Sequence, residues 1–109
     1  MVLGVLIYCI ECNGLEVVSC DADPPGRGVG RALVGGALDL AREHALRRVW
    51  CTTTNDNLPA LGFWQAIGFA LVARWPGAVA DARELKPSVA SHGYRGLASR
   101  DELDLELTL

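Results

Sequence analysis

Residues 15–54 constrain the fold most, because their pattern changes from a strand to a helix and back to a strand. Residues 15–21 and Arg48–Thr54 are rich in residue types that favour strands. Between them, residues 29–46 carry apolar side chains at helical spacing, which form the expected buried face of Val29, Leu33, Ala37, Leu40 and Ala41. Two strands joined by such a helix are expected to be parallel, with a right-handed crossover.

A glycine-rich loop precedes this helix and reads Gly26-Arg27-Gly28-Val29-Gly30. Glycines let the backbone approach a ligand closely, and the first N–H groups of a helix favour negative charge. The loop therefore predicts a phosphate or pyrophosphate site, to which Arg27 adds a positive charge. It lacks the third glycine of the dinucleotide pattern G-x-G-x-x-G and the lysine of the P-loop. From the loop alone, a glycine-rich turn that binds nothing remains the alternative.

The other segments complete a mixed sheet. Residues 2–12 are expected to form a buried strand that turns at Asn13-Gly14 into the strand of residues 15–21. Downstream we expect a helix over 59–67, a strand over 69–75, a short helix over 76–85, an irregular segment over 86–101 and a strand over 102–109. In the last strand Leu103, Leu105, Leu107 and Leu109 share one face. The predicted fold is α/β (α+β), with a mixed, mostly antiparallel sheet around a central parallel β-α-β unit.

Length and charge bound the class of protein. The 109 residues fit one domain, residues 1–109, that is large enough to bury a core. The net charge of −3 lacks the basic surplus of a nucleic-acid-binding protein, so we expect no nucleic-acid partner. The apolar run at residues 2–10 is too short for a membrane span and lacks the features of a signal peptide. We therefore expect no membrane partner and a cytoplasmic location.

Cys9 and Cys12 have the C-x-x-C spacing of metal ligands, but no second pair accompanies them. An offset of three on one strand places two side chains on opposite faces. We expect no metal site, and we interpret both cysteines, with Cys20 and Cys51, as buried or half-buried thiols.

Two motifs follow each other along the chain. The first, Arg27-Gly28-Val29-Gly30-Arg31-Ala32-Leu33, resembles the coenzyme A loop of the GNAT superfamily of N-acetyltransferases, [Q/R]-x-x-G-x-[G/A]. The second, Asn57-x-x-Ala60-x-x-Phe63-Trp64 with Gly68-Phe69 closing its helix, is similar to that family's second signature, one helix and one strand further on. The resemblance covers nearly the whole chain. It implies a single GNAT-like domain that lacks the family's N-terminal strand, two helices and second strand.

The resemblance implies acetyl-CoA as cofactor. Its residues here would be Val18, Cys20, Arg27, Gly28, Val29, Gly30, Arg31 and Asn57. The amides of the glycine loop would hold the pyrophosphate, and Arg27 would flank it. Backbone groups of Val18 and Cys20 would bind the pantetheine arm and the acyl carbonyl, where the family's strand bulges. Pro25 departs from the family, which prefers Gln or Arg there.

The implied activity is transfer of acetyl from the thioester to an amine of a small molecule or peptide. Glu16, on the strand beside the acyl position, is the candidate base, and a solvated strand carboxylate is the equal alternative. Asp21 and Asp23 are weaker candidates. Trp64 stands where the family usually has a tyrosine acid, and an indole N–H does not ionise usefully. We therefore expect Trp64 to pack, and the departing thiolate to leave unaided.

An uncovered first strand would be an apolar sheet edge, so we expect a homodimer. Three functions remain open at this point. They are an N-acetyltransferase, a non-catalytic acetyl-CoA-binding module, and a remnant interaction domain without a ligand.

Overall fold

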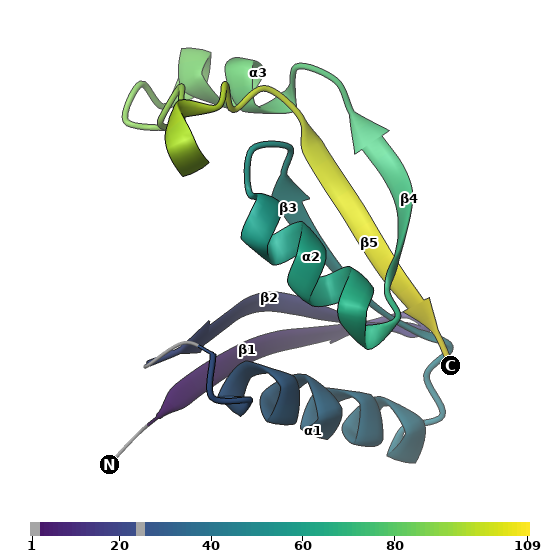
Figure 1. Ribbon diagram of the computed structural model, residues 1–109. Helices are drawn as coiled ribbons and strands as arrows, with labels where there is room; N and C mark the ends of the chain where they lie inside the picture. Colours follow the sequence, from purple (N-terminus) through teal and green to yellow (C-terminus); the bar gives the residue numbers. More distant parts are fainter. Residues whose placement is uncertain (1–2, 24–25) are drawn as a thin grey trace. The chain divides into compact units, whose positions relative to one another are not determined.

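The computed structural model describes residues 3–23 and 26–109. Its five-stranded sheet has the order β1-β2-β3-β5-β4 (Figure 1). The elements are β1 (Gly4–Glu11), β2 (Gly14–Ala22), α1 (Val29–Glu43), β3 (Arg48–Thr54), α2 (Leu58–Ile67), β4 (Ala70–Trp75), α3 (Ala78–Leu85), the 3-10 turn η1 (Tyr94–Gly96) and β5 (Glu102–Thr108). The chain forms two compact units, one of Met1–Cys51 with Glu106–Leu109 and one of Thr52–Leu105. The start of the strand predicted over residues 2–12, and Pro25, lie outside the described residues.

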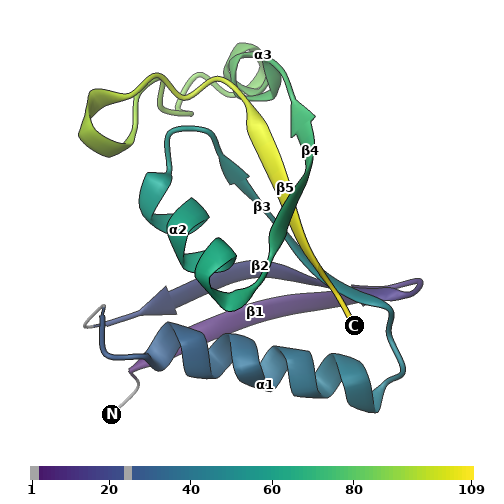
Figure 2. The same cartoon turned by 45° about the vertical axis from the view of Figure 1, so that its right-hand side comes forward.

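The predicted β-α-β unit is confirmed. β2 pairs with β1 in antiparallel and with β3 in parallel, and α1 connects β2 to β3. Two views show α1 lying along the hairpin of β1 and β2 (Figures 1 and 2). The helix buries Val34, Ala37 and Ala41, and the strands of this unit bury Leu15, Val17, Val49 and Cys51. These small and branched side chains form the core of the first unit.

The buried face of α1 differs in part from the prediction. Ala37 and Ala41 are buried as expected, but Val29, Leu33 and Leu40 are only half-buried. The start of α1 lies directly over Gly4 of β1, where a Cβ atom would come within 2.8 Å of Val29 Cγ1 and 3.0 Å of Leu33 Cδ1. Because β1 is the last strand at its end of the sheet, the side chains above it are covered on one side only.

The hairpin turn is displaced by one residue from the prediction. Glu11 pairs with Gly14, so the turn residues are Cys12 and Asn13, and Cys12 takes a positive φ of 51°. Gly14 is instead a buried strand residue, where a Cβ atom would lie 3.2 Å from the Arg48 side chain. The glycine therefore lies in close contact with β3 and outside the turn.

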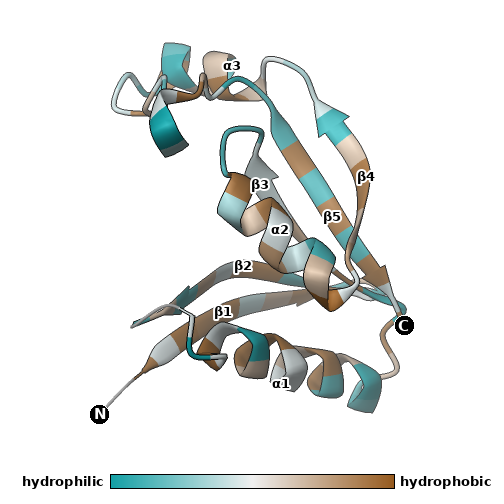
Figure 3. Ribbon diagram, in the orientation of Figure 1, coloured by the Kyte–Doolittle hydropathy of each residue, from teal (hydrophilic) through white to brown (hydrophobic). Residues whose placement is uncertain are grey.

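The prediction that the first strand is buried is wrong. Val5, Ile7 and Tyr8 are 49%, 54% and 47% exposed, although Figure 3 shows β1 as largely hydrophobic. β1 lies at one edge of the sheet, as an uncovered first strand was expected to do. Cys9 and Cys12 are exposed, contrary to the prediction of buried or half-buried thiols, whereas Cys20 is half-buried and Cys51 is buried.

α1 ends at Glu43, before the predicted end near Leu46. The N–H of Leu46 donates to the carbonyl of Ala41 at 2.9 Å, and the N–H of Ala45 donates to Arg42 at 3.0 Å. This pair of bonds is the Schellman motif, in which the residue after the cap is usually glycine. Here Ala45 occupies that position with a φ of 54°. Because no glycine marks this position, the sequence pattern predicted a helix end beyond the observed one.

The second unit packs around Trp64. This side chain is 6% exposed, and its ring lies 5.1 Å from Phe63 and 4.9 Å from Phe69 between centroids. The prediction that Trp64 is a packing residue is confirmed. β5 buries Leu103 and Leu105 from its predicted apolar face, while Leu107 is half-buried and Leu109 exposed.

The polar face of β5 ties it to both neighbouring strands. Asp104 accepts hydrogen bonds from Thr52 Oγ1 of β3 at 2.7 Å and from Trp75 Nε1 of β4 at 2.9 Å.

The segment between α3 and β5 is irregular as predicted, apart from the turn η1. No helix among the described residues is long and apolar enough to cross a membrane.

Candidate functional site

The glycine loop presents free backbone donors at the start of α1. Gly26 and Gly28 have positive φ values of 81° and 77°, and a Cβ atom at either would meet nothing within 4 Å. The first helical bond runs from the N–H of Ala32 to the carbonyl of Gly28 at 3.0 Å, so the N–H groups of the preceding residues have no acceptor in the helix. The N-cap, Gly28, makes no side-chain capping bond, and the first turn holds no acidic residue. These donors suit an anion supplied from outside the chain.

Two arginines flank these donors. Arg27 precedes Gly28 and Arg31 lies in the first turn, and both are exposed. Their guanidinium groups add positive charge to that of the helix N-terminus. The loop predicted to bind phosphate therefore has the conformation and the charge that such binding needs.

β2 carries a bulge beside this loop. Ile7 pairs with Ser19 and Tyr8 with Val17, so Val18 is the extra residue, and it is 57% exposed. The pairing of β2 with β3 ends at Val17 and Cys51, whereas its pairing with β1 continues to Ala22. Within the described residues, the later half of β2 thus leaves its β3 side unpaired. A strand edge of this kind offers N–H and carbonyl groups to an extended ligand.

The Cys20 side chain, on the unpaired part of β2, contacts the backbone at the start of α1. Its Sγ lies 3.9 Å from the carbonyl oxygen of Gly30. Desolvation, with a further contribution from the negative charge of Asp21, raises the pKa of the Cys20 thiol. The structure therefore brings Val18 and Cys20 into the same unit as the loop residues Arg27–Arg31 and keeps Cys20 as a neutral thiol at neutral pH.

Glu16 lies on β2 ahead of the bulge. It is half-buried and pairs with Cys9 of β1 and Trp50 of β3. In the described part of the chain it makes no hydrogen bond and no ion pair. Its carboxylate is therefore available, and its role as the base stays a prediction.

The second motif has a structural role in the other unit. Asn57 is the N-cap of α2, and its Oδ1 accepts the N–H of Ala60 at 3.2 Å. Gly68 ends α2 with a φ of 120°, which explains the glycine, and Phe69 is buried. Asn57 is exposed, and within the described residues its Nδ2 has no partner, so a contact with a cofactor remains a prediction. Its role as a helix cap was not predicted.

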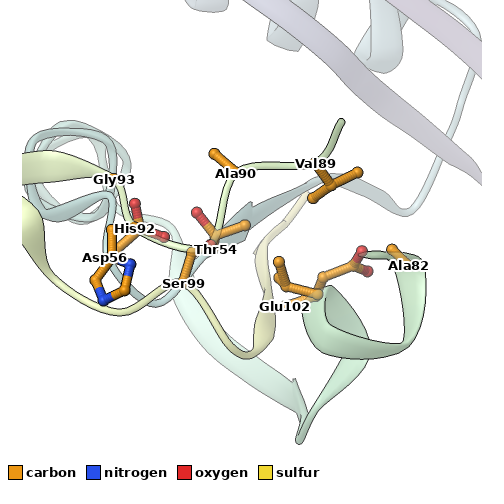
Figure 4. A pocket seen from close by; sticks show the side chains of 10 residues that line it. Thr54, Asp56, Ala82, Val89, Ala90, His92, Gly93, Ser99 and Glu102 are labelled. Atoms are coloured by element: carbon orange, nitrogen blue, oxygen red, sulfur yellow. The ribbon is translucent and has the colours of Figure 1, made fainter. Parts of the chain in front are cut away.

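The sequence reasoning missed Asp56. This carboxylate (Figure 4) is 6% exposed, and its Oδ2 accepts the N–H of Tyr94 at 3.4 Å. Burial acts to raise the pKa of Asp56, but hydrogen bonding from the hydroxyls of Thr54 and Ser99 and from backbone N–H groups outweighs it, so the pKa is lowered. The only signal in the sequence was a run of Asn and Asp after a strand, which is also typical of turns.

Among residues 3–23 and 26–109, no group of three or more His, Cys, Asp or Glu side chains is placed to hold a metal ion. Asp21, Asp23 and His92 are exposed, and the negative charge of Asp21 acts on the Cys20 thiol.

A glycine loop before a helix, a bulged strand and an unpaired strand edge are the features of an α/β protein that suit a phosphate-bearing ligand. Residues 9–69 match the model of the Acetyltransferase (GNAT) family, and the chain belongs to that family. It is 33% identical over 102 residues to the uncharacterized protein YdhI of Bacillus subtilis, and the match covers 94% of this chain. The chain spans only 64% of the length of YdhI.

Two further relatives carry functional descriptions. Streptothricin acetyltransferase of Streptomyces lavendulae is 42% identical over 45 residues, which is 41% of this chain and 24% of that protein. A GNAT family acetyltransferase from Elizabethkingia anophelis, solved with acetyl-CoA bound, superimposes with a TM-score of 0.86 and 15% identity, covering 100% of this chain and 70% of that one. The predicted family and fold class are thus confirmed.

Proposed function

We propose that this protein is an acetyl-CoA-dependent N-acetyltransferase. The observation that carries the proposal is the cluster of unpaired backbone donors at Gly28–Arg31, next to the bulged and half-paired strand β2. Within this proposal, the amides of Gly28, Val29, Gly30 and Arg31 hold the pyrophosphate, and Arg27 adds charge. Backbone groups at Val18 and Cys20 hold the arm that carries the thioester.

The residues present fit this cofactor. The two positive-φ glycines leave open space where side chains would stand, and the unpaired donors and arginines complement phosphate. Acetyl-CoA, when bound, supplies the acetyl group as a thioester. Backbone N–H groups near the bulge at Val18 are suited to donate to the carbonyl oxygen of that group, which needs no side chain.

Glu16 is the proposed base that accepts the proton of the incoming amine. Its carboxylate makes no other hydrogen bond or ion pair among the described residues. Trp64 is buried in an aromatic cluster and supplies no acid. The proposed reaction therefore relies on a thiolate that leaves unaided, which is tolerable because a thiol has a pKa of about 8.5. Loss of an acid costs roughly ten- to a hundredfold in rate.

A non-catalytic acetyl-CoA-binding module is the second candidate function, and the burial of Trp64 at the position of the family's acid favours it. The two candidates share the cofactor and differ in turnover. For the first candidate the acceptor is an amine on a small molecule or a peptide. The name of one relative, streptothricin acetyltransferase, indicates that this relative acts on a small molecule.

The first experiment is calorimetric titration with acetyl-CoA, with NAD as the comparator. We expect micromolar binding of acetyl-CoA and none of NAD. Gly28→Glu places a charge and a side chain in the anion site and should abolish binding. Gly36→Glu, which adds the same charge at an exposed position further along α1, is the matched control and should bind normally. Failure of a folded wild-type sample to bind acetyl-CoA would eliminate both candidates.

We also propose a homodimer, with a second copy of the chain covering β1. This strand is at the edge of the sheet, and its Val5, Ile7 and Tyr8 side chains are about half exposed. Edge strands with exposed apolar side chains tend to pair with another strand. Size-exclusion chromatography with light scattering should give twice the chain mass, and Ile7→Lys should shift it to the monomer. A wild-type monomer at all concentrations contradicts this assembly.

A further inference from the structure

The second part of α1, residues 36–43, has several features that hold it in the helical conformation. It buries Ala37 and Ala41 against the strands of the first unit. Arg42 lies in the last turn, where the helix dipole favours positive charge. The Schellman bonds after the helix satisfy its last carbonyl groups. Burial, charge and capping therefore all stabilise this part.

The first part of α1, residues 29–35, has fewer of these features. Its N-cap, Gly28, makes no side-chain hydrogen bond, and its first turn contains no acidic residue. Arg27 and Arg31 instead place positive charge at the positive end of the helix dipole, which is unfavourable. Of residues 29–35, only Val34 is buried. This part is therefore held mainly by one side chain at its far end.

Two adjacent glycines, Gly35 and Gly36, lie at the boundary between the two parts. A Cβ atom at either position would meet nothing within 4 Å, and neither glycine has a positive φ. Within the described chain, neither packing nor backbone conformation thus requires glycine here. Glycine inside a helix is destabilising relative to alanine, because it loses more conformational freedom on folding. The pair therefore weakens the connection between the first part and the better-supported second part.

A phosphate-bearing ligand would supply what the first part lacks. Its oxygens can accept hydrogen bonds from the free N–H groups that precede Ala32, in place of a capping side chain. Its negative charge offsets the positive end of the dipole and attracts Arg27 and Arg31. The groups that destabilise the first part without a ligand thus stabilise it with one. Binding and helix formation in residues 29–35 are therefore coupled.

We propose that residues 29–35 open and close separately from the rest of α1, and that the phosphate groups of the bound ligand hold them in the helical form. In the free chain these residues are helical in most molecules, but they open without unfolding of residues 36–43. The ligand binds the helical form alone, because only that form aligns the N–H groups. The identity of the ligand rests on the function proposed above, whereas the opening itself does not.

The first test is amide hydrogen exchange of the full chain without a ligand, followed by NMR. The N–H groups of residues 33–35 report on the first part, and those of residues 40–43 report on the second. We expect protection factors at least about tenfold lower for residues 33–35, because local opening exposes them. Equal protection along the whole of α1 would overturn the proposal.

One variant and a matched control locate the opening. Gly35→Ala adds a methyl group in open space and should raise the protection of residues 33–35 about two- to fivefold. Gly62→Ala makes the same change in open space on α2, in the other unit, and should leave that protection unchanged. No effect of Gly35→Ala, or an equal effect of both variants, refutes a local opening of α1.

The second test adds the ligand. Acetyl-CoA at about a hundred times its dissociation constant should slow exchange at residues 33–35 about a hundredfold, since the open form does not bind it. Inorganic pyrophosphate, which supplies the phosphate groups alone, should also slow this exchange when in excess. No slowing by either probe overturns the proposal.

Failure here is distinguishable from failure of the proposed function. Slower exchange with pyrophosphate, without binding of acetyl-CoA, keeps the coupled opening and removes the cofactor. Binding of acetyl-CoA to a helix that is evenly protected without a ligand does the reverse.

Discussion

Replacing Ala45 with glycine is expected to stabilise the protein by about 1 kcal/mol. Ala45 follows the cap of α1 with a φ of 54° and completes the Schellman bonds. The left-handed conformation costs an L-residue roughly 1–2 kcal/mol, and glycine avoids that cost. The greater conformational freedom of glycine in the unfolded chain offsets roughly 0.5–1 kcal/mol of this gain in stability. The methyl group of Ala45 is exposed, so its removal loses no buried contact.

The measurement is urea denaturation followed by circular dichroism, with a thermal melt in support. A gain of 1 kcal/mol corresponds to a rise in Tm of roughly 4–8 °C for a unit of this size. The control is Ala32→Gly, an exposed position inside the same helix, which should cost roughly 0.5–1 kcal/mol. If Ala45→Gly is destabilising while Ala32→Gly costs the expected amount, the left-handed assignment of Ala45 is refuted.

Three further predictions concern the candidate sites. Saturating acetyl-CoA should protect Cys20 from alkylation, read by mass spectrometry, and should leave the exposed Cys9 and Cys12 reactive as internal controls; equal labelling of Cys20 with and without the cofactor contradicts its placement. Glu16→Gln should lower kcat by roughly 10²–10⁴ with acetyl-CoA affinity unchanged, and an unchanged kcat would exclude Glu16 as the base. Because the pKa of Asp56 is lowered, its contribution to stability is present above the unfolded value of about 3.9 and is lost as the pH falls through the folded value. Denaturation curves at a series of acid pH values should therefore fall less steeply for Asp56→Asn, and identical slopes would contradict the lowered pKa.

Patterns that depend on neighbours in sequence predicted the elements well. The strand Arg48–Thr54 and the end of α2 at Ile67 coincide with the prediction, because β-branched residues and a glycine stop are local signals. The glycine loop was equally readable, since its conformation requires the glycines themselves.

The errors came from contacts between distant segments. Gly14 looked like a turn glycine, but it pairs with Arg48 of β3, and a Cβ atom there would lie 3.2 Å from the Arg48 side chain. β1 looked buried because it is apolar, and nothing local reveals that it is an edge strand. The importance of Asp56 arises from residues 93–99, which lie some forty positions further along the chain and fold over its carboxylate.

Gly4 sets the thickness of the layer between β1 and the start of α1. A Cβ atom there would lie 2.8 Å from the backbone oxygen of Asp21 and 2.8 Å from Val29 Cγ1, so a side chain at position 4 would displace either the neighbouring strand or the start of the helix that carries the proposed anion site. Gly4 thus affects the position of Gly28–Arg31 through the packing of the helix on the strand, without a contact to the ligand. A survey of variants for weakened cofactor binding would identify position 4 together with the glycine loop, although the one acts through distance and the other through direct hydrogen bonds.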